Sequence, residues 1–406
     1  MRTKPFAAFQ PPPELASRVA AVPYDVVDTA EARALAAGNP DSFLHVTRPD
    51  IDLPDGTDPY APAVYRQSAS AWQELQTRRV MCRDTAERFY VYRQVMGAHC
   101  QTGVVACCHV DDYARDIIRK HERTRQDKED DRTRHVLALN ANAGPVFLTH
   151  RDDPAITALV VAATRELPLY DFTAADGVRH VVWRVAGDSP TWVAAFDRLP
   201  LAYVADGHHR AAAAARAGRE RQAANPRHAG TEAYNWFLAV LFPASQLCVL
   251  PYNRCVSGLN GLDPESLLAR VREHFTVTPT TGSEASVPRT ARMYLAGHWH
   301  QLSWPPFEAD PVGRLDVSVL QDRLLAPLLG VADPRTDSRI SFIGGSRGLE
   351  ALARRVDSGQ ADVAFALHPV TVDQMMDIAD ANQIMPPKST WFEPKLRSGL
   401  LVHALD

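Results

Sequence analysis

The sequence predicts an α+β fold in which mixed sheets, built largely from hairpins, carry packed helices. The first observation is that strand-like runs lie close together in the chain, such as 89–95 and 102–110. The second is that helical and strand-like segments do not alternate strictly, as a doubly wound sheet would require. The third is composition: 46% of the 406 residues are hydrophobic and 23% are charged, which is typical of a packed globular protein.

The N-terminal third is expected to join short helices through proline-rich loops. A helix is predicted at 29–38, with Thr29 as its N-cap and a glycine at its end. Residues 41–49 are predicted to form a strand, and the amphipathic run 64–79 a helix.

The rest of the chain follows the same patterns. The runs 89–95 and 102–110 are rich in β-branched and aromatic residues and predict a hairpin. The later elements are predicted in this order: strand 145–150, hairpin 178–185 with 191–197, strand 201–205, helix 210–217, a strand pair within 236–256, helix 263–275, hairpin 291–304, helix 317–330, strand 339–345, helix 349–359, strand 361–370, helix 371–382 and an extended tail 385–405.

The chain is long enough for two or three domains at roughly 100–200 residues each. We expect an N-terminal α/β region at 1–88, a catalytic core at 89–260 and a C-terminal α+β region at 261–406. The sequence leaves the oligomeric state open.

Charge and hydropathy narrow the class of function. The formal net charge is −4, and no helix-turn-helix or basic stripe is found, so no nucleic-acid partner is expected. The N-terminus lacks the apolar core of a signal peptide, and no run approaches 18 apolar residues. A cytoplasmic protein with no membrane partner is therefore expected.

The motif Asp206–Arg210 is the sharpest chemical signal. It lies between a predicted strand and an alanine-rich helix, where free backbone N–H groups and the helix dipole bind anions. Gly207 allows close approach of a ligand, and Arg210 can hold a phosphate or carboxylate. His208 and His209 are expected to be neutral there. The alternative is that Asp206 is only an N-cap.

A second signal is the motif Lys120–Thr124, at the start of the polar run 119–135. It combines cations, an imidazole, a carboxylate and a hydroxyl, the mixture that polyphosphate chemistry needs. The alternative for the later part of the run is a solvated helix face with ion pairs such as Asp130–Arg134.

A third candidate is the segment Pro386–Thr390, in which two prolines precede Lys388, Ser389 and Thr390. Lys395 and Arg397 follow closely. The prolines stiffen an extended arm whose polar end can close on an anion, and the alternative is an edge strand with polar decoration.

The chain resembles the domain-of-unknown-function 1015 family over nearly its whole length. The segments that carry the resemblance occur in the order 23–27, 38–46, 120–124, 144–148, 170–180, 205–216 and 385–400. The motif Asp206–Arg210 also resembles that of the ParB/sulfiredoxin-like superfamily, which includes free L-serine kinases that use ADP. The resemblance implies a ParB/sulfiredoxin-like core and pyrophosphate-dependent phosphorylation of L-serine.

Resemblance and chemistry together imply the site roles. Either Glu122 or Asp206 would accept the serine hydroxyl proton, and the other would orient the acceptor or hold Mg²⁺, with Asp206 as the expected metal ligand. His121 and Thr124 would contact the substrate. The expected phosphate-binding residues are Lys120, Arg123, Gly207, His208, His209, Arg210, Lys388, Ser389 and Thr390.

The donor is left open among pyrophosphate, ADP and ATP, since the alanine-rich helix after Arg210 departs from the family pattern. Two other functions compete with a kinase. One is a non-catalytic, ParB-like nucleotide-binding regulatory module, and the other is a phosphatase on the same anion site.

Overall fold

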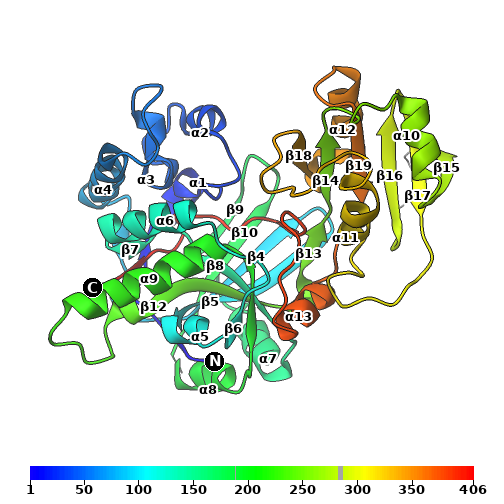
Figure 1. Ribbon diagram of the computed structural model, residues 1–406. Coiled ribbons are helices and arrows are strands. Elements are labelled where there is room, and N and C mark those ends of the chain that lie inside the picture. The colour runs from blue at the N-terminus through cyan, green and yellow to red at the C-terminus, as the bar shows by residue number, and fades with distance from the viewer. Residues whose placement is uncertain (188, 282–286) are drawn as a thin grey trace. The chain divides into compact units, whose positions relative to one another are not determined.

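The computed structural model describes residues 1–187, 189–281 and 287–406, and they form two compact units (Figure 1). The first unit contains Met1–Leu247 and Pro394–Asp406, and the second contains Cys248–Glu393. The expected α+β class is confirmed, because helices pack on one mixed sheet and one antiparallel sheet. The ParB/sulfiredoxin-like core stays a prediction.

The first unit is built on a mixed sheet that, within the described ranges, has nine strands. Its order is β6-β11-β8-β12-β5-β4-β10-β9, with β1 paired to β5. These strands are β1 (Thr3–Lys4), β4 (Tyr90–Met96), β5 (His99–His109), β6 (Ile118–Arg119), β8 (Val146–His150), β9 (Tyr170–Thr173), β10 (Arg179–Arg184), β11 (Ala202–Asp206) and β12 (Trp236–Pro243). Two small pairs join β2 (Phe9–Gln10) to β3 (Cys82–Arg83) and β7 (Ala141–Asn142) to β21 (His403–Ala404).

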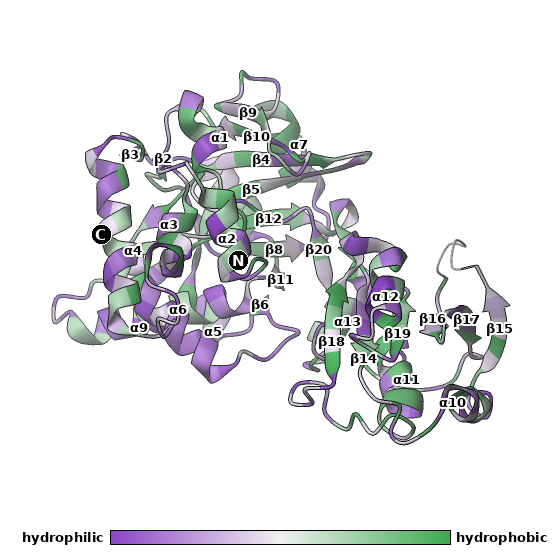
Figure 2. Ribbon diagram, turned by 90° about the horizontal axis from the view of Figure 1, so that it is seen from above, coloured by the Kyte–Doolittle hydropathy of each residue, from purple (hydrophilic) through white to green (hydrophobic). Residues whose placement is uncertain are grey.

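Helices cover this sheet and extend from it. They are α1 (Ala16–Val19), α2 (Thr29–Ala36), α3 (Leu44–Thr47), α4 (Pro62–Thr77), α5 (Val110–Ala114), α6 (Gln126–Leu139), α7 (Pro154–Ala163), α8 (Ser189–Asp197) and α9 (His208–Ala224). Helix α9 packs against β12 and β8 through small buried residues such as Ala211 and Ala215, which let the helix approach the sheet closely. Figure 2 shows α6 as largely hydrophilic.

The second unit contains an antiparallel sheet of order β15-β17-β16-β19-β14-β18. Its strands are β14 (Tyr252–Val256), β15 (Thr276–Thr280), β16 (Thr290–Leu295), β17 (His298–Ser303), β18 (Ile340–Gly344) and β19 (Val363–Leu367). A separate pair joins β13 (Cys248–Leu250) to β20 (Trp391–Glu393). The helices include α10 (Pro264–Val271), α11 (Asp316–Leu320), α12 (Gly348–Asp357) and α13 (Val372–Asp380).

The division into units differs from the three regions expected at 1–88, 89–260 and 261–406. Residues from α1–α4 share one buried cluster with Leu139, Ala141 and Val402, so the N-terminal stretch belongs to the first unit. Strand β14 pairs with β18 and β19, which places the end of the expected core in the second unit.

Two predicted strands are helical instead, and the strands described within 236–256 do not pair with one another. Residues 44–47 are helical, because a short apolar run fits a buried helical turn as well as a strand. Residues 189–197 form α8, in which Trp192, Ala195 and Phe196 are buried at helical spacing. Strand β10 therefore pairs with β4 and β9, and β12 does not pair with the strands that follow it.

None of the described helices in either unit is long and apolar enough to cross a membrane.

Candidate functional site

Parallel pairing of β6 with β11 brings the two strongest sequence motifs together. Ile118 pairs with Ala202, and Arg119 pairs with Tyr203. Because the carboxyl ends of parallel strands meet at the same sheet edge, the residues after β6 continue beside the end of β11. The ladder partners are 84 positions apart, as are Glu122 and Asp206. The shared offset explains how two distant carboxylates come to one edge.

A bulge at the end of β11 redirects Asp206. The register of β11 against β8 shifts between Val204 and Asp206. Bulges re-aim a side chain where a ladder ends. The next residue, Gly207, has φ +92° and directly precedes α9, and no side chain caps that helix. The first N–H groups of α9 therefore have no capping partner and can meet an anion.

Two cations hold the carboxylate of Asp206. Arg210 Nη2 lies 2.6 Å from Asp206 Oδ2, and Lys395 Nζ lies 3.3 Å from Oδ1. Both cationic side chains are nearly buried, with 10% and 11% exposed, whereas 28% of Asp206 is exposed. Burial raises the pKa of Asp206, but the charges of Lys395 and Arg210 outweigh this and hold it well below its usual range. The site thus combines one fixed carboxylate with two cations.

Position 207 has to be glycine because the side chain of Arg210 folds over it. A Cβ there would lie 2.8 Å from Arg210 Nε. The guanidinium therefore folds over Gly207, donating through Nη1 to Pro145 O and through Nη2 to Asp206. Its buried Nε has no hydrogen-bond partner among the described residues. Arg210 is thus mainly an organising cation, rather than the open two-pronged clamp expected from the sequence.

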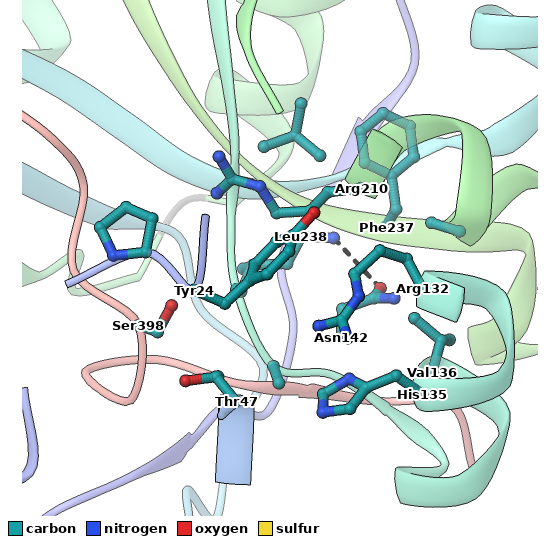
Figure 3. Close-up of a pocket in the computed structure, with 15 residues that line it drawn as sticks. Tyr24, Thr47, Arg132, His135, Val136, Asn142, Arg210, Phe237, Leu238 and Ser398 are labelled. Atoms are coloured by element: carbon teal, nitrogen blue, oxygen red, sulfur yellow. Dashed lines mark hydrogen bonds between the residues drawn. The ribbon is translucent and has the colours of Figure 1, made fainter. Parts of the chain in front are cut away.

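Arg210 also lines a small cavity. Figure 3 shows it beside Tyr24, Arg132 and Arg210, and its volume is about 40 Å³. The guanidinium of Arg132 lies 4.2 Å from the Tyr24 ring centroid and pairs with Asp131 at 2.7 Å. At about 10–15 Å³ per probe-sized water, the cavity has room for about three waters. Arg210 therefore borders both the Asp206 carboxylate and a small, mainly apolar cavity.

His121, Glu122 and His208 form a compact cluster at the same sheet edge. One ligand atom from each lies within 4.8 Å of the others. The two rings stand at 90° with centroids 4.4 Å apart, and His208 Nδ1 lies 4.0 Å from Glu122 Oε2. Burial lowers the pKa of His121 to about 4 and that of His208 well below its usual value. Both imidazoles are thus neutral near pH 7.

The C-terminal arm, residues 394–398, positions Lys395. Gln94 and Gln101 are fully buried on one face of the sheet, and Gln94 donates to Lys395 O at 2.8 Å. Arg397 pairs with Asp176 and contacts His180 Nε2 at 3.2 Å. These contacts fix the arm along β4 and β10, so that the Lys395 side chain reaches Asp206.

Several predicted site residues have other partners or lie elsewhere. Lys120 Nζ lies 2.5 Å from Asp116, and Thr124 Oγ1 donates to Glu129 at 3.0 Å. Arg123 is exposed. His209 lies in the first turn of α9, and its buried Nδ1 has no hydrogen-bond partner in the described structure. Asp130 pairs with Arg216 at 2.5 Å, although the sequence pointed to Arg134.

The residues of the third motif, Lys388, Ser389 and Thr390, belong to the second unit. Ser389 Oγ donates to Pro386 O at 2.6 Å, and Lys388 Nζ lies 5.4 Å from the Tyr252 ring centroid. Sequence reasoning placed the phosphate contact on these residues and left Lys395, which pairs with Asp206, out of the site. The signal available in the sequence was the positive charge of Lys395, which follows closely after Pro386 and Pro387.

Asp206 does not fit as a Mg²⁺ ligand. Mg²⁺ binds through carboxylate oxygens that keep it octahedrally hydrated. Both oxygens of Asp206 already face a cation, at 2.6 and 3.3 Å. A divalent ion there would be repelled by both, so no step is assigned to Mg²⁺ at this residue.

Known proteins that are similar to the chain include one family and several solved structures. A family model described as "Protein of unknown function (DUF1015)" matches residues 3–318. No curated protein matches the chain.

Solved structures similar to the chain include a conserved hypothetical protein from Pyrococcus furiosus, with 13% identity and a TM-score of 0.37, covering 72% of this chain and 93% of that one. A free serine kinase mutant in complex with ADP has 13% identity and a TM-score of 0.35, covering 71% and 87%. SbnI with a C-terminal truncation from Staphylococcus aureus has 11% identity and a TM-score of 0.37, covering 73% and 86%.

Proposed function

The chain belongs to the DUF1015 family, and on that premise we propose that it transfers a phosphoryl group to the hydroxyl of a free small molecule. The acceptor proposed from the family resemblance is L-serine, and the product is O-phosphoserine. The donor is pyrophosphate, with ADP or ATP as the other candidates. A cytoplasmic setting without a nucleic-acid partner stays a prediction.

The observation that carries this proposal is the pairing of Asp206 with Arg210 and Lys395 at the start of α9. Two cations face the Asp206 carboxylate beside uncapped backbone N–H groups, and Glu122 adds one negative charge next to His208 at the same edge. The buried Nε2 of His208 adds a polar atom with no partner among the residues described. Phosphoryl transfer depends mainly on such positioning and charge neutralisation.

The acceptor side of the proposal rests on Glu122. Asp206 is a poor proton acceptor, because both of its oxygens are engaged by cations. Glu122 has 42% of its side chain exposed and lies beside His208. It is therefore the carboxylate available to act on the serine hydroxyl, either by taking its proton or by holding a cation that acidifies it.

The test is a donor panel on the full chain. L-serine is supplied with pyrophosphate, ADP or ATP in separate reactions, and O-phosphoserine is measured. We expect product with at least one donor. Phosphate release from O-phosphoserine alone would indicate a phosphatase, and donor binding without either reaction would indicate a regulatory module; each result would overturn the proposal.

Lys395→Met is the matched test of the donor site. Removing one preorganised donor group typically lowers turnover by about 10²–10³-fold, and we expect a loss of that order in kcat/KM for the donor. Lys4→Met is the control, since Lys4 Nζ lies over the Trp236 ring at 5.1 Å. Equal kinetics in the two variants would contradict the role of Lys395.

A further inference from the structure

The cluster of His121, Glu122 and His208 has the donor set of a metal site. His121 and Glu122 follow β6, and His208 opens α9 after β11, so paired strand ends hold all three. Their ligand atoms lie within 4.8 Å of one another. Around a bound ion at 2.0–2.1 Å, tetrahedral donors are about 3.3 Å apart, so the three side chains have to move together by no more than about 1.5 Å to hold an ion.

The residues around the cluster favour an occupied site over a simple polar contact. His208 is 6% exposed, and its Nε2 has no hydrogen-bond partner within the described part of the chain. A buried polar atom without a partner is costly unless a ligand satisfies it. Nε2 is therefore the His208 nitrogen that an ion would satisfy, and the 4.0 Å separation of His208 Nδ1 from Glu122 Oε2 is too long for a hydrogen bond between the two side chains.

The chemistry of the donors selects the ion. Two imidazoles and one carboxylate are the three-ligand set of catalytic zinc sites, which keep a fourth position open. Imidazole nitrogen suits Zn²⁺ and its first-row neighbours, whereas Mg²⁺ prefers oxygen ligands. Glu122, with 42% of its side chain exposed, puts the open position on the solvent side.

We propose that His121, Glu122 and His208 bind one divalent transition-metal ion of the Zn²⁺ type. This places a metal beside Asp206 instead of on it, away from the contacts of Arg210 and Lys395 with that carboxylate. The role in turnover rests on the proposed function: an acceptor hydroxyl in the open position has its pKa lowered by the ion, and its proton leaves to solvent. Glu122 is then a ligand and not the base.

Metal binding is measured on the full chain after chelator treatment, using equilibrium dialysis against Zn²⁺ or Mg²⁺ and elemental analysis. We expect one Zn²⁺ per chain and no comparable uptake of Mg²⁺. Co²⁺ substitution should give the visible absorption of a tetrahedral site. Equal uptake of both ions, or none of Zn²⁺, would overturn the proposal.

Variants then assign the ligands. His121→Ala, His208→Ala and Glu122→Gln should each weaken Zn²⁺ binding by at least about 100-fold, since even outer-shell partners contribute about 10–100-fold. His209→Ala is the control, because this neighbouring histidine lies outside the cluster. Glu122→Gln changes a partly exposed side chain and should fold normally, so wild-type Zn²⁺ affinity in that variant would refute the site.

The two proposals fail in different ways. Zn²⁺ binding without phosphoryl transfer would reject the kinase and leave the metal site intact. Phosphoryl transfer in a chain that binds no Zn²⁺ would reject the metal site and return Glu122 to the role of base.

Discussion

At the scale of single residues, Gly207 shows how one backbone position controls the site. Its φ of +92° lies in the region where a side chain is strained, and the guanidinium of Arg210 occupies the space where a Cβ would be. The same residue thus sets the direction of α9 and lets Arg210 reach Asp206.

Gly207→Ala should therefore impair both stability and the site. The φ strain alone costs about 1–3 kcal/mol, and the clash with Arg210 adds to it. Gly38→Ala is the control, since Gly38 has φ +68° and no atom within 4 Å of its Cβ position. We expect a larger fall in the urea midpoint for Gly207→Ala, together with loss of donor binding. Equal midpoints and unchanged donor binding would contradict this account of Gly207.

Residue chemistry also separates the two candidate carboxylates. The sequence left open which of the two is the base, because each is an acidic residue in a motif rich in cations. In the structure, Asp206 is engaged at both oxygens, while Glu122 faces two neutral imidazoles. Environment therefore distinguishes the two groups, although their ordinary pKa values are similar.

At the scale of elements, the C-terminal arm, residues 394–398, acts as a structural part of the site. Its path is fixed by buried polar side chains, Gln94 and Gln101, that face it from β4 and β5. Buried amides of this kind are retained where they have hydrogen-bond partners. The arm therefore couples the sheet to Lys395 and, through Lys395, to Asp206.

Gln94→Met should loosen the arm. The change removes the 2.8 Å hydrogen bond to Lys395 O and the 3.0 Å acceptor for Gln101 Nε2. A loss of about 1–3 kcal/mol is expected. Amide hydrogen exchange of residues 395–398 should accelerate, and the donor KM should rise. Gln73→Met, on the exposed side of α4, should change neither quantity. Unaltered exchange in Gln94→Met would show that other contacts hold the arm.

At the scale of the whole molecule, buried histidines should make the fold sensitive to acid. Burial lowers the pKa of His135 and of His403 to about 4, from 6.5 in the unfolded chain. Above pH 6.5 the folded and unfolded states bind equal numbers of protons at these groups, so their contribution to stability is fully retained. As the pH falls from 6.5 towards 4, the unfolded state alone takes up protons, and stability decreases.

His403→Gln should reduce this acid sensitivity. A shift of 2.5 units corresponds to about 3 kcal/mol at most for one group. Glutamine keeps a donor for Ala233 O, which lies 3.1 Å from His403 Nε2. Urea midpoints measured at pH 7.5 and pH 5 should differ less in this variant than in the wild type. His99→Gln, at the turn between β4 and β5, is the control, and an equal change in both variants would exclude His403 as a cause.

The sequence by itself determined the α+β class, the 89–110 hairpin and the strand-to-helix turn at Asp206–Arg210. Each of these depends on local signals: β-branched runs, a glycine before a helix, or hydrophobic periodicity. The same local signals do not distinguish a strand from a helix in short apolar runs. For this reason the sequence predicts strands at 41–49 and 191–197, where the structure has helices at 44–47 and 189–197.

Only the tertiary structure decided which residues share the site. The β6–β11 pairing joins positions 84 apart, and the β4–arm contact joins Gln94 to Lys395 across the chain. Neither contact leaves a periodic trace in the sequence, because each depends on which strands become neighbours in the folded sheet. His121, Glu122 and His208 therefore meet as one cluster, and Lys395 reaches Asp206, only once strand order and register are set.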